Sequence, residues 1–284
     1  MIRPTGTSPR RSLPAAHFRI ALVIVIAAGS GCAPRLAPLP GGLGTPFADY
    51  AEAYAEATAR CRGVRTYVGV LDLSGRAGEE RIRGRVEAGF AAPGLIRLEG
   101  RPPALAFGRA IFVLVGRASD ATLILPRDRR VLTDAPTDAI IETLAGVALT
   151  ADELRAIVSG CGLGLVEDPS GARAYEDGLV AVNGAETTTW LRNAEGTWRP
   201  FATVRGPLEI RYEEFNGAYP TRIRIRTAPA DFGAHADLTV RTSDVDINTD
   251  LDPEVFREPV PDDCIPITLD ELRRARIQGE ERQP

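Results

Sequence analysis

Lysine, methionine and histidine are the residues that this 284-residue sequence lacks or nearly lacks. No lysine occurs, so all 34 Lys+Arg residues are arginine, the only methionine is Met1, and there are two histidines. The absence of lysine excludes a Schiff-base lysine and a phosphate-binding P-loop lysine. Two histidines are too few for a zinc site built on imidazole groups. The formal net charge of -4 argues against a nucleic-acid partner, which needs concentrated positive charge.

The composition that remains is that of a globular protein. Hydrophobic residues make up 44% of the chain and charged residues 25%, and the length suits one large domain or two small ones. We find no internal repeat, which argues against a propeller or a solenoid.

The N-terminus has the features of a secretion signal. Arg3, Arg10 and Arg11 precede an apolar run at residues 20–28 that contains no charge. This run is much shorter than the ~20 residues that a membrane-spanning helix needs, so residues 1–31 are predicted to be a signal peptide. Its removal takes away four arginines and no acid, which brings the formal net charge to -8.

The signal ends in Gly29-Ser30-Gly31-Cys32, which resembles the lipobox of bacterial lipoproteins, although Gly29 stands where that motif prefers leucine. The resemblance implies acyl chains on Cys32, and two or more such chains anchor a protein stably, because each buried methylene contributes about 0.8 kcal/mol. The alternative is an ordinary signal-peptidase site. Ala33 follows the cysteine where an inner-membrane lipoprotein has aspartate, so we expect an outer-membrane protein that faces the periplasm. Residues 32–44, rich in proline and glycine, are predicted to be a flexible tether.

Three further cysteines follow, Cys61, Cys161 and Cys264, so an oxidising compartment permits one disulfide and leaves one thiol. We favour the pair Cys61–Cys161, because each residue closes a predicted helix and the bond would join the two helices. Buried, unpaired thiols are the alternative.

Apolar spacing and capping residues predict four helices in residues 45–284. The first begins at Thr45-Pro46 and ends at Gly63, and its apolar residues recur every three or four positions. The second covers residues 136–145 and ends at Gly146. Thr150 and Glu153 form a predicted capping box for the third, which runs to Gly160, and Thr268 and Glu271 do so for a short terminal helix at residues 269–276.

Alternating apolar and polar residues predict about a dozen antiparallel strands. The segments 65–73 and 80–90 form a predicted hairpin about residues 74–78. Other predicted strands lie at residues 95–99, 110–115, 121–125, 130–132, 179–182, 187–191, 198–204, 208–212, 221–226 and 237–241. A flat sheet of this size is uncommon. The predicted fold is therefore mainly β (α+β), with one highly curved antiparallel sheet.

The first half of the mature chain resembles the lipoprotein receptor LolB and, more loosely, the carrier LolA. The similarity runs through residues 63–66, 95–99, 101–108 and 111–114, and is strongest over residues 138–149 and 154–160, where Ala145 replaces a family threonine. Residues 244–248 resemble the closing strand of the family.

The resemblance implies an open half-barrel with short helices over its concave side, which encloses an apolar cavity for acyl chains. In the loop 101–108 it implies an exposed hydrophobic tip at Leu105 and Phe107; both side chains could instead be tucked into the core. The inward faces of the predicted strands supply cavity-lining candidates, although large apolar strand residues belong to the core by default. These candidates are Phe90, Phe112, Leu114, Leu123, Trp190 and Trp198.

Catalysis has little support in the sequence. His235 is the only histidine after the signal peptide, and no Gly-x-Ser-x-Gly motif accompanies it. Asp244, Asp246, Asp250 and Asp252 lack the spacing of a calcium loop. We expect no enzyme activity, no cofactor and no metal. The resemblance favours a lipoprotein that binds lipids or acylated lipoproteins and assists their transfer at the outer membrane, with a periplasmic carrier as a possible partner. A non-enzymatic envelope sensor or partner-binding module on the same fold, and a hydrolase, are the alternatives.

Overall fold

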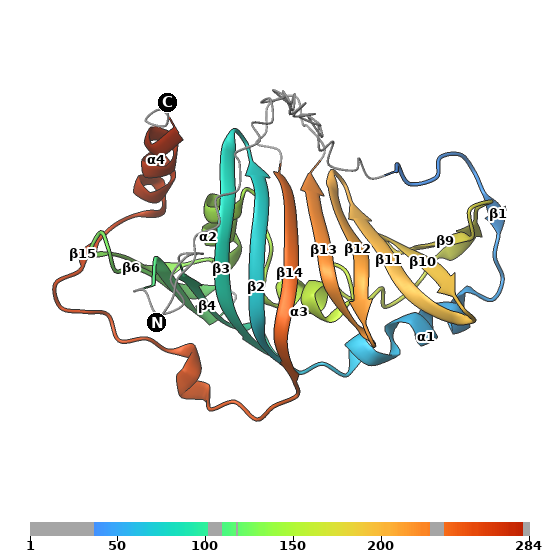
Figure 1. The fold of residues 1–284 in the computed structure, drawn as a ribbon, viewed down its shortest axis with the longest axis horizontal. Coiled ribbons are helices and arrows are strands. Elements are labelled where there is room, and N and C mark those ends of the chain that lie inside the picture. The colour runs from blue at the N-terminus through green and yellow to red at the C-terminus, as the bar shows by residue number, and fades with distance from the viewer. Residues whose placement is uncertain (1–36, 102–109, 118, 228–235, 281–284) are drawn as a thin grey trace, which may run out of the picture. The chain divides into compact units, whose positions relative to one another are not determined.

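A curved sheet that does not close on itself organises the structure (Figure 1). The computed structural model describes residues 37–101, 110–117, 119–227 and 236–280. Residues 40–284 form one compact unit, distinct from residues 1–39. No helix among the described residues is both long enough and apolar enough to span a membrane.

Fifteen strands from the described residues make up this sheet. In spatial order they are β1 (Thr45–Pro46), β8 (Gly171–Ala174), β9 (Leu179–Asn183), β10 (Thr188–Ala194), β11 (Thr197–Arg205), β12 (Leu208–Asn216), β13 (Tyr219–Thr227), β14 (Ala236–Ile247), β2 (Thr66–Ala77), β3 (Glu80–Ala91), β4 (Leu95–Arg101), β5 (Phe112–Arg117), β6 (Asp120–Leu125), β7 (Arg130–Ala135) and β15 (Ile265–Pro266). Neighbours are antiparallel except β15 and β7, which are parallel. The predicted mainly β half-barrel is therefore confirmed, with three short strands that the sequence patterns did not predict, β1, β8 and β15.

Four α-helices and one 3₁₀ helix from the described residues accompany the sheet: α1 (Tyr50–Arg62), α2 (Thr137–Ala145), α3 (Ala151–Ser159), α4 (Leu269–Glu280) and η1 (Pro253–Phe256). The predicted capping boxes are present. The Thr150 hydroxyl accepts from Glu153 N, and the Glu153 carboxylate accepts from Thr150 N. Thr268 and Glu271 make the same reciprocal pair before α4.

The β2–β3 hairpin is longer than its sequence pattern suggested. Its strands pair from Thr66 with Ala91 to Ala77 with Glu80, and only Gly78 and Glu79 form the turn. Gly78 has φ 63°, which glycine adopts without strain. A two-residue turn keeps the alternation in phase on both strands, so one face of the hairpin is apolar except at Glu80, next to the turn.

The main core lies between the concave face of the sheet and helices α2 and α3. It includes Tyr67, Phe90, Ile96, Ile140 and Ile157, each at most 1% exposed. Alternate strand residues point into this core, and their neighbours point to the convex face.

Helix α1 covers the other end of the sheet and begins later than predicted. Ala53 and Tyr54 pack against β8, β9 and β10 in a second apolar cluster. The predicted helix start at Thr45-Pro46 is wrong, because these two residues pair with Ala174 and Arg173 as strand β1. The local helix signals at these residues do not decide the structure, because their long-range pairing covers the edge of β8.

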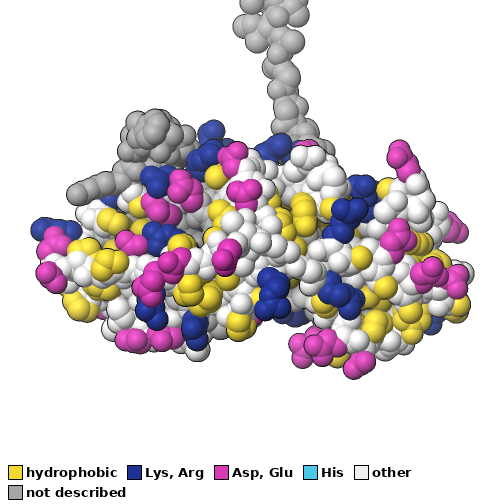
Figure 2. Space-filling view, turned by 90° about the horizontal axis from the view of Figure 1, so that it is seen from below, with side chains coloured by type: hydrophobic (Ala, Val, Ile, Leu, Met, Phe, Trp, Pro, Cys, Tyr) yellow, Lys and Arg dark blue, Asp and Glu magenta, His cyan; other side chains and the backbone are white. Residues whose placement is uncertain are grey.

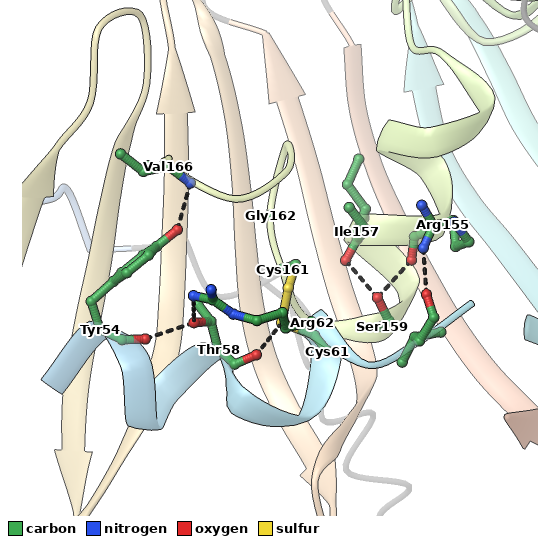
Figure 3. The surroundings of a disulfide bond; sticks show 12 residues. Tyr54, Thr58, Cys61, Arg62, Arg155, Ile157, Ser159, Cys161, Gly162 and Val166 are labelled. Carbon is green, nitrogen blue, oxygen red and sulfur yellow. Dashed lines mark hydrogen bonds between the residues drawn. A yellow bond between two sulfur atoms is a disulfide. The ribbon is translucent and has the colours of Figure 1, made fainter. Parts of the chain in front are cut away.

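A disulfide joins α1 to the end of α3, as predicted. Cys61 and Cys161 have their Cα atoms 5.5 Å apart and lie 100 residues apart in the sequence. Figure 3 shows Tyr54 on the same helix, whose hydroxyl accepts a hydrogen bond of 2.7 Å from Val166 N. The disulfide and this hydrogen bond attach α1 to the segment that follows α3. Cys264 is free and partly buried.

The C-terminal segment passes over the outside of the sheet. β14 continues to Ile247 through a bulge between Ser243 and Asp246, so the predicted strand 237–241 and the family-like segment 244–248 are one strand. Phe256 is buried where η1 meets β4. The chain then pairs with edge strand β7 and ends in α4, which contacts α2.

Candidate functional site

An apolar cavity of about 240 Å³ lies between the concave face of the sheet and the α2–α3 pair. Its wall is formed by Leu71, Leu73, Ile82, Arg83, Gly84, Arg85, Val86, Phe90, Leu98, Gly100, Arg101, Ile111, Phe112, Ile141, Leu144, Ala145, Val147, Leu149, Leu154, Ile157, Val158, Ile223, Ile225, Leu238 and Val240. None of these described lining residues is acidic. The wall thus offers mainly hydrocarbon contact.

The sheet side of the cavity follows from strand alternation. Leu73 pairs with Gly84 between β2 and β3, and Val86 pairs with Gly100 between β3 and β4. All four face the concave side and line the cavity. The three lining arginines occupy the intervening positions, so the pleat directs their side chains to the opposite face.

The helix side is built from the apolar faces of α2 and α3. Ile141 and Leu144 lie three residues apart on α2, and Leu154, Ile157 and Val158 lie on one face of α3. The capping box at Thr150 fixes where α3 begins, and Gly160 ends it with φ 95°. These helix ends place the apolar face of α3 over the sheet.

Two glycines of the cavity wall, Gly84 and Gly100, have different surroundings. A Cβ atom added to Gly84 would meet no atom within 4 Å, so this position borders open space. A Cβ atom added to Gly100 would lie 2.2 Å from Cε1 of Phe112. The Phe112 ring therefore occupies the space that a side chain at position 100 would need.

Buried tyrosines near the cavity hold the surrounding structure in place. The Tyr212 hydroxyl accepts a 2.7 Å hydrogen bond from Gly162 N and donates to Ile157 O at 3.1 Å. This links β12 to the end of α3. Burial raises the pKa of Tyr212 and of Tyr67 well above the ordinary value of a tyrosine, so both phenols are neutral at physiological pH.

The structure brings two of the six cavity-lining candidates to the cavity. Phe90 and Phe112 line it. Leu114 on β5 and Leu123 on β6 are fully buried in the main core and do not line the cavity. Trp190 packs against Tyr175, with ring centroids 5.1 Å apart.

Trp198 belongs to another part of the molecule. Its ring lies 5.7 Å from that of Phe47, and it lines a separate cleft of about 300 Å³ beside α1. Strand alternation alone could not distinguish residues that line the cavity from the residues of β10 and β11 that lie under α1. The helix residues of the cavity wall were missed, although the apolar spacing of 141 and 144 and of 154, 157 and 158 is a signal for them.

Several predicted positions lie outside the described residues: Cys32, Leu105, Phe107 and His235. The lipidation and the exposed loop tip stay predictions. Arg101 and Ile111, which are described and lie near the two ends of the loop in the sequence, both line the cavity, and Ile111 is 38% exposed.

One face of the molecule, seen in Figure 2, mixes hydrophobic side chains with both signs of charge. Among the described residues no group of histidine, cysteine, aspartate and glutamate is arranged to hold a metal ion. The cavity is therefore the feature of the described structure that points most directly to a ligand.

No protein-family model matches this chain, and no curated protein matches its sequence. Solved structures do. A LolA superfamily protein from Nitrosomonas europaea is 13% identical, with a TM-score of 0.50, over 76% of this chain and 99% of that one. The fold is LolA-like. At this identity the likeness concerns the fold and carries no function with it.

Two further structures are similar at lower scores. A DUF1329 family protein from Desulfovibrio piger has a TM-score of 0.44 at 12% identity, over 74% of this chain and 98% of that one. LprF from Mycobacterium bovis has a TM-score of 0.30 at 11% identity, over 78% and 100%. In this LolA-like half-barrel β15 pairs with β7 and α4 contacts α2.

Proposed function

We propose that this protein binds the acyl chain of a lipid or an acylated lipoprotein in the cavity beneath α2 and α3, without catalysis. The observation that carries the proposal is the cavity wall itself, in which apolar side chains from the sheet and both helices surround open space beside Gly84. An apolar cavity of about 150 Å³ already binds benzene, so this larger cavity suits a hydrocarbon chain.

The driving force is the removal of methylene groups from water. Each buried methylene contributes about 0.8 kcal/mol, so the number of chain carbons that enter sets the affinity. No described lining residue is acidic, and the three lining arginines direct their side chains to the opposite face, so nothing inside the cavity would distinguish one headgroup from another. Selectivity for the headgroup belongs to residues at the rim or beyond it.

The cellular role that we propose is assistance in transfer or insertion at the outer membrane. The lipobox-like segment before Cys32 supports an acyl anchor, and the tether after it would let the domain reach cargo near the periplasmic surface. A periplasmic carrier that delivers acylated cargo is the partner that this role requires. Leu105 and Phe107 are the residues proposed to contact the membrane during release.

Filling the cavity from Gly84 tests the proposal. Gly84→Leu places a side chain into open space on an ordinary backbone, because φ at this residue is not in the left-handed region. We expect the affinity for cis-parinaric acid, a fatty acid that is itself fluorescent, to fall at least about tenfold, equal to 1.4 kcal/mol. The measurement is fluorescence titration, followed by displacement with a diacylated peptide.

Gly89→Leu is the matched control. Gly89 lies on the same strand but on the convex face, where an added Cβ would meet only Arg97 Cβ at 3.9 Å. We expect it to bind the fatty acid as the unchanged protein does. Equal binding by the Gly84 and Gly89 variants, with both folded, would overturn the cavity as the binding site. Binding without transfer of the diacylated peptide to vesicles would overturn the transfer role alone.

A further inference from the structure

The face of the sheet behind the cavity carries a regular array of arginines. Strands β13, β14, β2 and β3 lie side by side at the centre of the sheet (Figure 1). Their cross-strand register forms three rows on the convex face: Arg226, Asp237, Arg76 and Arg81; Arg224, Thr239, Ser74 and Arg83; and Arg222, Arg241, Asp72 and Arg85. We call these twelve residues the arginine face.

The arginine face is strongly positive in a chain that is negative as a whole. Its eight arginines and two aspartates leave six formal positive charges among these twelve residues, and Glu213, Glu214 and Asp244 beside the third row reduce this to three, whereas the whole chain carries -4. With strands about 4.8 Å apart and alternate residues about 6.8 Å apart, the array covers roughly 14 Å by 14 Å. It is broad and two-dimensional, and it contains no apolar or aromatic side chain.

Nearby acids compensate one end of the array more than the other. In the third row, Arg222 pairs with Glu213 at 2.7 Å and with Glu214 at 3.0 Å. In the first two rows Asp237 is the only acid, and Glu209 of the next strand, β12, lies opposite Arg226. Asp237 holds Arg224 through two hydrogen bonds of 2.7 Å and lies 3.9 Å from Arg226.

The remaining arginines of those two rows are open to solvent. Arg76 donates to the backbone oxygen of Glu79 at 2.7 Å. Arg81 and Arg83 are exposed, and no carboxylate of the described residues lies within 4.0 Å of either. These guanidinium groups can therefore take external anions.

Cross-strand pairing places like charges opposite each other in the array, and Glu214 lies near both arginines of one such pair, 3.0 Å from Arg222 and 3.9 Å from Arg241. Arg76 lies directly opposite Arg81, and Arg222 directly opposite Arg241. Like charges at opposed positions destabilise a sheet, and no described carboxylate offsets the charges of Arg76 and Arg81 within 4.0 Å. An anionic surface that binds the array would relieve the repulsion, and natural proteins accept such local conflicts mainly at functional sites.

We propose that the arginine face docks on an anionic lipid surface by binding headgroup phosphates. Guanidinium groups bind phosphate oxygens in pairs, and a flat array of charges matches many separate headgroups. A single-stranded nucleic acid would need aromatic stacking platforms, and a stable protein partner would need an apolar centre. Neither feature occurs among the twelve residues.

The docking proposal is independent of acyl binding. The concave neighbours of the array, including Leu73, Ile225, Leu238 and Val240, line the cavity. Docking through the convex face would hold the cavity wall against the membrane while leaving α2 and α3 on the far side of the sheet. A ligand in the cavity is not required for it.

Vesicle flotation of the full chain tests the proposal. The variant Arg76→Gln/Arg81→Gln/Arg226→Gln removes every arginine of the first row, and none of the three lines the cavity. Binding is measured at limiting lipid on phosphatidylcholine vesicles with and without phosphatidylglycerol, and the ratio of the two is the gain from phosphatidylglycerol. Binding that does not depend on lipid charge contributes equally to both measurements. We expect the gain from phosphatidylglycerol to fall at least tenfold, since each basic residue near an anionic surface contributes roughly fivefold.

Two matched variants separate position from charge. Arg127→Gln/Arg130→Gln/Arg173→Gln removes three exposed arginines elsewhere and should keep the full gain. Arg76→Lys/Arg81→Lys/Arg226→Lys preserves the charge and should keep most of it. The gain should also decrease as salt rises from 0.05 to 0.3 M, over which screening increases.

Loss in the first-row glutamine variant alone, with unchanged binding of cis-parinaric acid, supports docking. An equal loss in both glutamine variants, or no loss in either, overturns it. Displacement by a DNA oligonucleotide or an acidic protein, with no response to phosphatidylglycerol, overturns the lipid assignment in favour of another anionic partner. Failure of acyl binding with intact docking would instead overturn only the proposed function.

Discussion

Phe112 occupies the space left by the missing side chain of Gly100, its partner across β4 and β5. A Cβ atom on Gly100 would lie 2.2 Å from Cε1 and 2.5 Å from Cδ1 of the ring. Both residues line the cavity. The position of the ring, and with it part of the cavity volume, therefore depends on the absence of a side chain at position 100.

Gly100→Ala should displace the Phe112 ring and reduce acyl binding. The added methyl group forces the ring to move, and overpacking of this kind costs about 1–3 kcal/mol. We expect a loss of stability in that range in urea unfolding, and weaker binding of cis-parinaric acid. Because Phe112 is only partly buried, the ring can turn and the protein should still fold.

A double-mutant cycle identifies the cause. In a Phe112→Ala background the methyl group meets no ring, so Gly100→Ala should cost at least about 0.5 kcal/mol less than in the unchanged protein. Additive costs of the two substitutions would show that the contact between residues 100 and 112 does not set the stability.

Removal of the disulfide should destabilise the fold. Cys61→Ala/Cys161→Ala opens a bond between residues 100 apart in the sequence, and loss of a native disulfide typically costs 2–5 kcal/mol. We expect a loss of this size in urea unfolding. Since Cys161 directly follows α3, which lines the cavity, the affinity for the fatty acid should also fall.

Cys264→Ala provides the control for loss of a sulfur atom. Its thiol is free and partly buried, so its removal should cost about 1 kcal/mol or less. A reducing agent should lower the stability of the unchanged protein and of the Cys264 variant, but not that of the Cys61/Cys161 variant. Insensitivity of the unchanged protein to reduction would contradict the stabilising role of the disulfide.

The sequence was informative where local rules govern structure. Alternation located most of the sheet, and the capping boxes at Thr150 and Thr268 located the starts of two helices, because each signal lies within a few residues. The disulfide also followed from a local argument, since Cys61 and Cys161 each close a helix. The half-barrel itself came from the resemblance in the α2–α3 region.

Long-range contacts were the part that the sequence could not supply. Thr45-Pro46 carries helix-start residues, yet pairs with β8 across about 130 positions of chain. Ile265 and Pro266 pair in parallel with β7 without any strand pattern. Likewise, an inward-facing Leu114 and an inward-facing Phe112 look alike in sequence until the packing of the helices decides which of them borders open space.

Tyr212→Phe should weaken the attachment of α3 to the sheet. The hydroxyl bonds to Gly162 N and Ile157 O. Ile157 O also accepts from Gly160 N, so the loss of the hydroxyl leaves the Gly162 N–H without this acceptor, which costs about 1–3 kcal/mol. Thermal unfolding measures the loss. Tyr219→Phe is the control, because Tyr219 packs at the edge of the same core and its hydroxyl has no hydrogen bond to described residues; a cost equal to that of Tyr212→Phe would contradict the assignment.

Stability should fall in alkaline solution because of the buried tyrosines. Burial raises the pKa of Tyr67 and Tyr212 in the folded protein, whereas the unfolded chain releases these protons near pH 10. Above about pH 10 the unfolded state therefore binds fewer protons than the folded state, and the free energy of unfolding decreases by up to about 1.4 kcal/mol per pH unit for each tyrosine. Urea unfolding at pH 8, 10 and 11, in a Cys264→Ala background that prevents thiol exchange, measures this slope. Tyr212→Phe should remove up to about 1.4 kcal/mol per pH unit from it, and an unchanged slope in that variant would show that another group is responsible.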